Sequence, residues 1–329
     1  MKRIAAGTPD SHTTFGGEMP DAGGVSGGKV PAFRLIAPAP SSIPVLIAVP
    51  HAGRAYTPAL LGALRNPALA AARLEDRLAD ALGEAVAAQT GAALLIADAP
   101  RAMIDLNRAP EDIDWGMIAG GPGPARAGPP GSGQTVGGRA RSGLGLVPRR
   151  LPGEGELWKR PLAYLELEAR IAGIHQPYHR CLADTLARLQ ARWGAALLID
   201  LHSMPPLPAR DGAGGAQIVL GDRFGASCHG ALVASAFTRL AREGWRAAHN
   251  RPYAGGYGLE RHAATARGIH ALQIEVDRRC YLDAGLSEPG EGFAAVVSLL
   301  VEMVRVLAGE VAALGATASS AAGWAQAAE

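Results

Sequence analysis

Short, almost wholly apolar segments that end in a histidine recur in this chain, and they constrain the fold most strongly. One covers residues 44–50 and precedes His51, and another covers 195–201 and precedes His202. Apolar runs of this length are typical of interior strands in a mostly parallel sheet. Similar runs occur at 92–97, 216–220 and 269–276. Segments with helical spacing lie between them, so the sequence predicts an α/β protein of three layers, α/β/α, with a mostly parallel mixed sheet.

Helices are expected between these strands. Leu74, Leu78, Leu82 and Val86 recur at helical spacing, and Gly91 follows as a helix-ending residue. The helices are expected at about 70–90, 161–193, 226–243 and 292–314.

Composition fits one large domain. The chain has 329 residues, of which 48% are hydrophobic, enough for a sizeable core. Residues 1–30 are polar and Gly-rich and are expected to form a flexible tail, and the Ala-rich end at 316–329 is expected to fray. The segment 31–315 is expected to be a single domain. Its Gly- and Pro-rich stretch 119–156 is expected to be a partly mobile functional loop, ordered around 142–148.

Several partner classes are not indicated. The formal charge is +2 with scattered basic residues, which predicts no nucleic-acid or acidic-lipid surface. No apolar run is long enough to cross a bilayer, and the N-terminus lacks the apolar region of a signal peptide. The three cysteines, Cys181, Cys228 and Cys280, form no C-x-x-C motif. A reducing, cytoplasmic location is therefore expected.

The two strand-end histidines suggest a shared metal ion. Ligands collect at the carboxyl ends of strands in open α/β sheets, and catalytic zinc commonly has three protein ligands and one open position. His51 and His202 would supply two ligands, and a carboxylate is expected as the third. Glu75, Asp76 and Asp80 are the candidates on the next helix, and Asp76 is preferred. The alternative is a solvated acidic helix face and two unrelated histidines.

An arginine cluster lies near the end of another strand. Arg101, Asn107 and Arg108 would present two guanidinium groups and an amide. Guanidinium groups bind carboxylates through paired hydrogen bonds, which favours an anionic substrate. The alternative is salt bridging to nearby acids at positions 105, 111, 112 and 114.

Glu275 stands in an apolar strand, where an unpaired buried carboxylate is costly. Beside a metal it would be a natural general base. The alternative is an ion pair with Arg278 or Arg279.

Tyr257 and His262 follow a glycine-rich loop and could bind substrate, or simply pack.

Eight short motifs occur in a specific order. They are Pro50-His51-Ala52-Gly53, Glu75-Asp76 with Asp80, Arg101 with Asp105-Leu106-Asn107-Arg108, Gly143-Leu144-Gly145-Leu146-Val147-Pro148, Pro177-Tyr178-His179, Asp200-Leu201-His202-Ser203, Gly255-Gly256-Tyr257 and Leu272-Gln273-Ile274-Glu275. Over residues 40 to 300, this set resembles the N-formylglutamate amidohydrolases. That family is similar in fold to zinc carboxypeptidases, which have a phosphorylase/hydrolase-like architecture.

The resemblance implies one Zn²⁺ per chain on His51 and His202, with a carboxylate such as Asp76 as third ligand. It also implies substrate binding by Arg101, Asn107 and Arg108. The expected reaction is hydrolysis of N-formyl-L-glutamate to formate and glutamate, as in histidine breakdown.

The resemblance also implies that Glu275 is the base, and Arg101 could stabilise the tetrahedral oxyanion. One departure is clear. Carboxypeptidases take their acidic ligand three residues after the first histidine, where this chain has Arg54.

Other functions stay open on the sequence alone. The chain could deacylate other N-acyl amino acids or act as a carboxypeptidase-like peptidase. A metal-free module that binds carboxylates is a further alternative. The expected partner is a small N-acyl amino acid, and the sequence does not indicate an oligomeric state.

Overall fold

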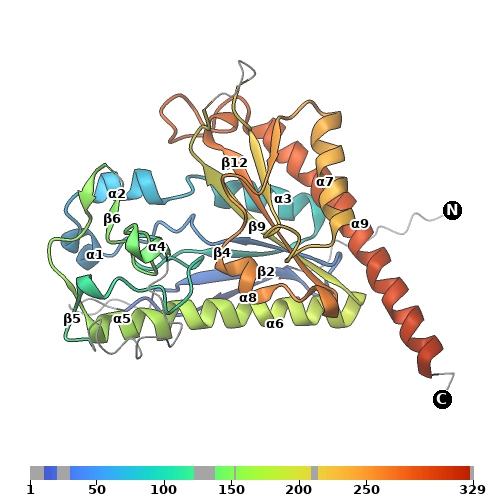
Figure 1. The fold of residues 1–329 in the computed structure, drawn as a ribbon, viewed down its shortest axis with the longest axis horizontal. Coiled ribbons are helices and arrows are strands. Elements are labelled where there is room, and N and C mark those ends of the chain that lie inside the picture. Colours follow the sequence, from blue (N-terminus) through green and yellow to red (C-terminus); the bar gives the residue numbers. More distant parts are fainter. Residues whose placement is uncertain (1–10, 21–29, 122–137, 152, 209–213, 327–329) are drawn as a thin grey trace, which may run out of the picture.

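An eight-stranded mixed sheet forms the centre of the molecule (Figure 1). The computed structural model describes residues 11–20, 30–121, 138–151, 153–208 and 214–326. The strand order is β1-β2-β4-β3-β9-β12-β10-β11. The strands are β1 (Ser11–Gly16), β2 (Phe33–Pro38), β3 (Val45–Val49), β4 (Ala93–Ala97), β9 (Ala196–Met204), β10 (Ile218–Gly221), β11 (Ala247–His249) and β12 (Ile269–Asp277). The four central strands, β4, β3, β9 and β12, are mutually parallel.

Helices cover both faces of this sheet (Figure 1). One face carries α3 (Ala79–Thr90), α7 (Gly230–Arg242) and α9 (Phe293–Gln326). The other carries α5 (Tyr164–Arg170), the π-helical turn η3 (Ile171–His175) and α6 (Gln176–Trp193). The central strands β3, β4, β9 and β12 contribute side chains to both cores because successive side chains point to opposite faces. In β3, Ile47 packs in the first core, and Leu46 and Ala48 pack in the second. The predicted three-layer fold with a mostly parallel mixed sheet is confirmed.

Shorter elements lie around the layers. They are α1 (Pro58–Ala63), α2 (Pro67–Leu74), α4 (Gly138–Arg141), α8 (Tyr257–His262), the 3₁₀ turns η1 (Trp115–Met117), η4 (Thr265–Arg267) and η5 (Arg278–Cys280), and the short strands β5 (Ile118–Ala119), β6 (Arg150–Leu151), β7 (Gly155–Glu156) and β8 (Leu162–Ala163).

The helix expected at 70–90 is interrupted, so that prediction was wrong. α2 ends at Leu74 and α3 begins at Ala79. Leu78 has φ 58°, a left-handed conformation that cannot continue a right-handed helix. Within the break, the Asp76 backbone N–H donates to the His51 carbonyl at 2.9 Å. The leucines keep helical spacing on both sides of this break, so the spacing did not reveal it. The break turns Asp76 toward His51.

The helix expected at 161–193 contains a change of winding. The π-helical turn η3 lies between α5 and α6, and the backbone stays helical through all three elements. The periodicity predicted the length of this helical stretch but not the extra residue in its middle turn.

Both chain ends differ from the expected tails. Residues 11–16 form β1, which pairs antiparallel with β2, so the prediction of an unstructured 1–30 was wrong for this segment. Backbone pairing at a sheet edge places few demands on sequence pattern. α9 continues to Gln326, past the expected end at 314.

Residues 122–137 of the expected loop lie outside the described residues, whereas Leu146 and Val147 are buried as expected for an ordered segment.

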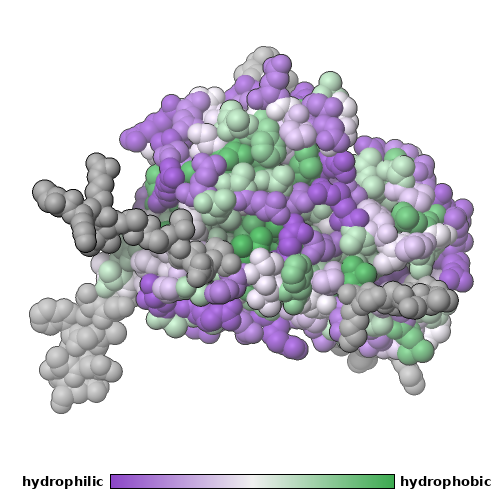
Figure 2. Space-filling model, turned by 180° about the vertical axis from the view of Figure 1, so that it is seen from behind, coloured by the Kyte–Doolittle hydropathy of each residue, from purple (hydrophilic) through white to green (hydrophobic). Residues whose placement is uncertain are grey.

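The surface seen from behind is largely hydrophilic, with hydrophobic side chains in separate small areas (Figure 2). Among the helices of the described ranges, none combines the length and the apolar character needed to cross a bilayer.

Candidate metal centre and active site

Adjacent parallel strands deliver the expected site residues to one edge of the sheet. His51 follows β3, and the loop with Arg101 and Asn107 follows β4. His202 and Glu275 are direct partners in the register of β9 and β12. The carboxyl ends of these strands meet because the strands are parallel neighbours, as expected for a ligand site in an open α/β sheet.

His51, Asp76 and His202 form a buried group that could hold a metal ion. Asp76 Oδ2 lies 3.0 Å from His202 Nδ1 and 3.6 Å from His51 Nδ1. Ligands of a tetrahedral zinc at about 2.0–2.1 Å would stand about 3.3–3.4 Å from each other. The distances from Asp76 Oδ2 to the two Nδ1 atoms lie on either side of that separation. His51, Asp76 and His202 therefore fit a zinc ion.

Carboxylates lie beside the Nε2 atoms of both imidazoles. His51 Nε2 lies 2.7 Å from Asp105 Oδ1, while His51 Nδ1 is buried and has no hydrogen-bond partner. His202 Nε2 lies 3.1 Å from Asp200 Oδ2, within ion-pair distance but without a hydrogen bond. Metal-binding histidines usually donate their second ring N–H to a carboxylate, as His51 can to Asp105. The unpartnered Nδ1 of His51 is therefore the atom that a cation would satisfy.

The electrostatic environment favours positive charge at this point. Burial acts to lower the pKa of His202, but Asp200, Asp76 and Glu275 outweigh burial and raise it well above its usual value. Burial likewise acts to raise the pKa of Asp76, yet its hydrogen bond to His202 and the nearby His51 ring hold that pKa well below the usual range. A site that stabilises an imidazolium beside a carboxylate also suits a divalent cation.

The two other candidate carboxylates face elsewhere. Asp80 pairs with Arg54 at 2.5 Å, and Glu75 Oε2 lies 3.6 Å from Arg77. Asp76 is the acidic residue that the chain break brings to the histidines. Arg54 pairs with Asp80 and keeps it away from His51, Asp76 and His202. This pairing gives a use for the basic residue that stands three positions after His51.

Close backbone contact explains the small residues after His51. A Cβ on Gly53 would lie 2.1 Å from the Ala99 carbonyl oxygen, so no larger residue fits there. This contact joins the loop after β3 to the loop after β4, which carries the arginine cluster.

Glu275 is buried beside this group. Its Oε1 accepts a hydrogen bond from Gln273 Nε2 at 2.8 Å. Burial raises the pKa of Glu275 to about 7, against the opposing effects of His202 and Arg101. The arginines considered as its partners bind other groups: Arg278 donates to Ser203 Oγ, and Arg279 pairs with Asp277. Glu275 therefore has the surroundings of a carboxyl group that can exchange a proton near neutral pH.

The arginine cluster lines the same cavity of about 580 Å³ as the histidines and Glu275. Arg101 Nε donates to Asp105 Oδ2 at 2.9 Å. Arg108 donates from Nε to the Leu144 carbonyl and from Nη1 to the Asn107 carbonyl, at 3.0 and 2.8 Å. The expected salt bridging to Asp105 is thus present for Arg101, and at 3.9 Å for Arg108, while the terminal nitrogens of Arg101 have no hydrogen bond to a described residue.

Asn107 connects the metal group to the glycine-rich loop. Its Oδ1 accepts from the Gly258 backbone N–H at 2.9 Å, and its Nδ2 lies 3.2 Å from His202 Nε2. A Cβ on Gly256 would lie 2.3 Å from Asn107 Oδ1, so the loop requires glycine here. The Oδ1 atom of Asn107 thus holds the glycine-rich loop, and its Nδ2 group lies at the cavity beside His202.

Tyr257 and His262 are the last two residues expected to contact substrate, and only Tyr257 lies at the cavity. Tyr257 lines the cavity. His262 is not among the residues that line it, because His262 is buried behind Tyr257 with Nε2 2.9 Å from His179 Nδ1. The expected direct contact of His262 with substrate is therefore not supported by its position.

Sequence reasoning missed the residues that orient the others. Asp105 and Gln273 are hydrogen-bonded to His51 and Glu275, and Asp200 lies within ion-pair distance of His202. A signal was present for two of them. Asp200 and Gln273 stand two positions before His202 and Glu275, and residues two apart share one face of a strand.

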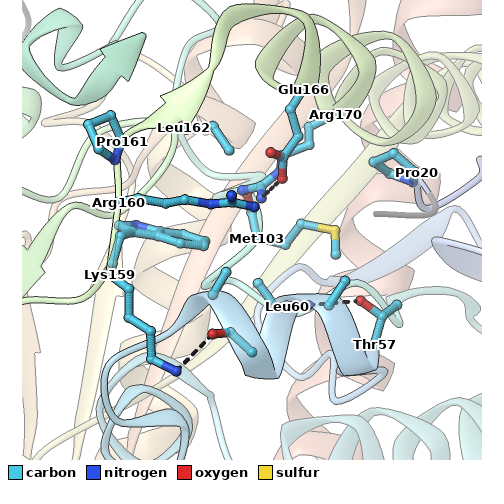
Figure 3. A pocket seen from close by; sticks show the side chains of 14 residues that line it. Pro20, Thr57, Leu60, Met103, Lys159, Arg160, Pro161, Leu162, Glu166 and Arg170 are labelled. Atoms are coloured by element: carbon cyan, nitrogen blue, oxygen red, sulfur yellow. Dashed lines mark hydrogen bonds and ion pairs between the residues drawn. The ribbon is translucent and has the colours of Figure 1, made fainter. Parts of the chain in front are cut away.

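A second cavity, of about 610 Å³, lies outside this site (Figure 3). It is lined by α1, the start of α5 and the segment 158–162, and it contains the ion pair of Arg170 and Glu166. None of the His–Asp–His group lines it.

Comparisons with known proteins agree with this architecture. A family model described as N-formylglutamate amidohydrolase matches residues 43–282. An N-formylglutamate deformylase of Pseudomonas aeruginosa is 30% identical over 272 residues, which are 79% of this chain and 92% of that protein. A Pseudomonas putida protein of the same name is 29% identical over 247 residues, 73% of this chain and 82% of that one. The crystal structure of an N-formylglutamate amidohydrolase from Ralstonia eutropha has a TM-score of 0.74 at 30% identity, covering 85% of this chain and 98% of that chain. The chain belongs to the N-formylglutamate amidohydrolase family.

Proposed function

We propose that this protein is a zinc-dependent amidohydrolase that converts N-formyl-L-glutamate to formate and L-glutamate. The observation that carries the proposal is one cavity lined by His51, Asp76, His202, Glu275 and arginines. Relatives named N-formylglutamate deformylase support the substrate. Release of glutamate from a formylated precursor fits the breakdown of histidine, and we expect the enzyme to act in the cytoplasm on a small molecule.

In this proposal His51 and His202 bind the zinc through Nδ1, and Asp76 binds it through Oδ2. Zinc supplies Lewis acidity, which polarises a carbonyl group and acidifies water. Asp105 accepts from His51 Nε2 and would hold that imidazole in the tautomer that leaves Nδ1 free for the metal, while Asp200 lies beside His202 Nε2. One zinc per chain is expected.

Glu275 is the proposed general base and acid. It takes a proton from the attacking water and later delivers that proton to the nitrogen of the leaving amine, since the product is a free amino group. Its burial and its raised pKa suit both transfers. Gln273 holds the Oε1 atom, which leaves Oε2 for the proton.

The substrate carboxylates are assigned to the arginine side of the cavity. Arg108 and Asn107 would bind the α-carboxylate, and the terminal nitrogens of Arg101 would stabilise the oxyanion that develops on the formyl oxygen. Tyr257 would donate to a substrate oxygen from the opposite wall.

A substrate panel on the purified protein tests the proposal. Release of a free amino group would be measured with N-formyl-L-glutamate, N-formyl-L-leucine, N-acetyl-L-glutamate and a dipeptide, and zinc would be counted by elemental analysis. We expect N-formyl-L-glutamate to have the highest kcat/KM with about one zinc per chain. Preference for the acetyl compound would indicate a general deacylase, and preference for the dipeptide a peptidase. Carboxylate binding with no turnover of any compound would indicate a binding module and refute the hydrolase.

A further inference from the structure

The segment from Met103 to Arg108 carries three site residues but forms neither a helix nor a strand. Asp105 orients His51, and Asn107 and Arg108 line the cavity. A segment without regular structure needs other partners for its backbone carbonyls, because buried polar groups in proteins are normally hydrogen-bonded. The partners of these carbonyls show what holds the site residues in place.

Three buried side chains of one helical stretch donate to this segment. Arg170 Nη1 donates to the Met103 carbonyl at 2.7 Å. His179 Nε2 lies 3.0 Å from the Leu106 carbonyl oxygen, and His175 Nε2 lies 2.9 Å from that of Arg108. Because a carbonyl only accepts, both imidazoles carry their proton on Nε2. The two histidines therefore hold the peptide groups on either side of the pair Asn107–Arg108.

The π-helical turn brings these donors to one side of the helix. Arg170 and His175 are five residues apart and would point about 140° away from each other on an α-helix. In a π-helical turn, residues five apart are hydrogen-bonding neighbours and lie one above the other. η3 spans Ile171–His175, between these two donors. His179 follows His175 by four residues, the spacing of one α-helical face.

The same helix also holds the opposite wall of the cavity. His179 Nδ1 lies 2.9 Å from His262 Nε2 at the end of α8, and the two rings are stacked with an interplanar angle of 14°. The Tyr257 ring at the start of α8 lies 5.1 Å from the His179 ring. His179 thus contacts both the Leu106 carbonyl and the helix that carries Tyr257.

We infer that Arg170, His175 and His179 are positioning residues for substrate binding, and that the π-helical turn exists to align them. They hold the Met103–Arg108 segment so that Asn107 and Arg108 face the substrate. Arg170 is anchored at its other terminal nitrogen by Glu166, in the second cavity (Figure 3). The inference rests on the proposed function, since it acts through the assigned role of Arg108.

Leucine and glutamine variants at both histidines test the inference. His175→Leu and His179→Leu remove the N–H donor, and kcat/KM for N-formyl-L-glutamate is expected to fall about 10–100-fold, mainly through KM, as the binding groups shift by a fraction of an ångström. Zinc content should not change. His175→Gln and His179→Gln keep an N–H at a similar reach and should restore most of the loss. His270→Leu is the matched control, because His270 is a buried histidine that packs against His229 away from the cavity.

A double-mutant cycle with Arg108→Ala separates positioning from general destabilisation. If His175 acts through Arg108, His175→Leu should have little further effect on KM in the Arg108→Ala background. Fully additive losses, wild-type KM in both leucine variants, or an equal loss in His270→Leu would each overturn the inference. If a leucine variant does not fold, the shorter His175→Asn replaces it and should lose what His175→Gln retains. Unchanged kcat/KM in Arg108→Ala alone would refute the substrate role of Arg108, and this inference with it.

Discussion

His51 Nε2 and Asp105 Oδ1 are 2.7 Å apart in the interior of the protein, which fixes which ring nitrogen of His51 faces Asp76. Asp105 is itself held by Arg101 Nε and by the Asn107 backbone N–H. Burial acts to raise the pKa of Asp105, but the neighbouring Arg101 and His51 outweigh burial and hold the pKa well below its usual range. Asp105 is thus a permanent carboxylate that joins the arginine cluster to the candidate metal ligand.

Replacing this carboxylate should weaken metal binding without removing a ligand. In Asp105→Asn the amide can donate to His51 Nε2 and favour the tautomer with the proton on Nδ1. We expect the affinity for zinc to fall about 10–100-fold, the usual effect of losing such a partner. Competition with a chromophoric chelator measures the affinity. Asp112→Asn, an acid at the cavity wall that accepts from the Ala140 backbone N–H, serves as the control. Equal affinities for zinc in Asp105→Asn and wild type would contradict this role.

The ligands themselves should be distinguishable from their acidic neighbours. His51→Ala, His202→Ala and Asp76→Ala should each abolish bound zinc and activity, because each removes one of three protein ligands. Glu75→Ala and Asp80→Ala should retain about one zinc per chain, since these carboxylates face Arg77 and Arg54. Elemental analysis after gel filtration reads out the result. Full zinc in the His51→Ala/His202→Ala double variant would show that the metal lies elsewhere.

Arg108→Ala should affect substrate binding rather than metal binding. Loss of one partner from a buried charged pair typically costs about 2–5 kcal/mol, so kcat/KM for N-formyl-L-glutamate should fall well over tenfold. Zinc content should stay at the wild-type level. Arg223→Ala is the comparison, because Arg223 lies at the same cavity but pairs with Glu260. Equal effects of the two substitutions on kcat/KM would mean that Arg108 has no special role.

The sequence predicted the strands and the strand-end residues because burial imposes a pattern on them. β3 is a continuous apolar run and β9 and β12 are mostly apolar, and the polar residues near the ends of the latter two, His202 and Glu275, were conspicuous for that reason. The pairing of His202 with Glu275 follows from parallel register, which strand patterns alone do not specify. Family resemblance supplied the expectation that these residues act together.

The residues that hold the site were not predictable from periodicity. The break before α3 depends on the left-handed conformation of Leu78, and leucine spacing continued across it. The π-helical turn η3 inserts one residue into an otherwise regular helix. The sequence indicated no partner for His175 and placed His179 only within a motif. The partners of both are backbone carbonyls some 70 residues earlier in the chain, which leave no mark in the side-chain pattern.

Stability should fall in mild acid because two buried histidines must stay neutral. Burial, with help from nearby positive charges, lowers the pKa of His262 to about 4 and that of His179 further still, from the usual 6.5. Below pH 6.5 the unfolded chain therefore binds more protons than the folded one, so this contribution is complete above pH 6.5 and is lost as the pH falls toward 4. Each histidine should contribute a slope of about 1.4 kcal/mol per pH unit.

Urea denaturation at several pH values between 7 and 4.5 measures this slope. His262→Gln keeps an N–H donor toward His179 but does not titrate, so its free energy of unfolding should depend less steeply on pH than that of the wild type. His12→Gln, at an exposed position on β1, should behave as the wild type. Parallel profiles for the wild type and His262→Gln would contradict the assignment of neutral buried imidazoles.

Glu275→Gln should separate proton transfer from metal binding. Glutamine preserves the shape of the side chain and can keep the contact to Gln273, but it cannot accept a proton from water. We expect kcat to fall about 10²–10⁴-fold, the usual contribution of a positioned general base. Zinc content and KM should change little, because Glu275 is assigned neither to the metal nor to the carboxylates.

The wild-type rate should rise with pH as the carboxyl group ionises. Burial places that pKa at about 7, and a bound cation would move it lower. This acidic limb should be absent from the residual activity of Glu275→Gln. Loss of zinc in this variant would make Glu275 a metal ligand, and near-normal turnover would refute the proposed mechanism.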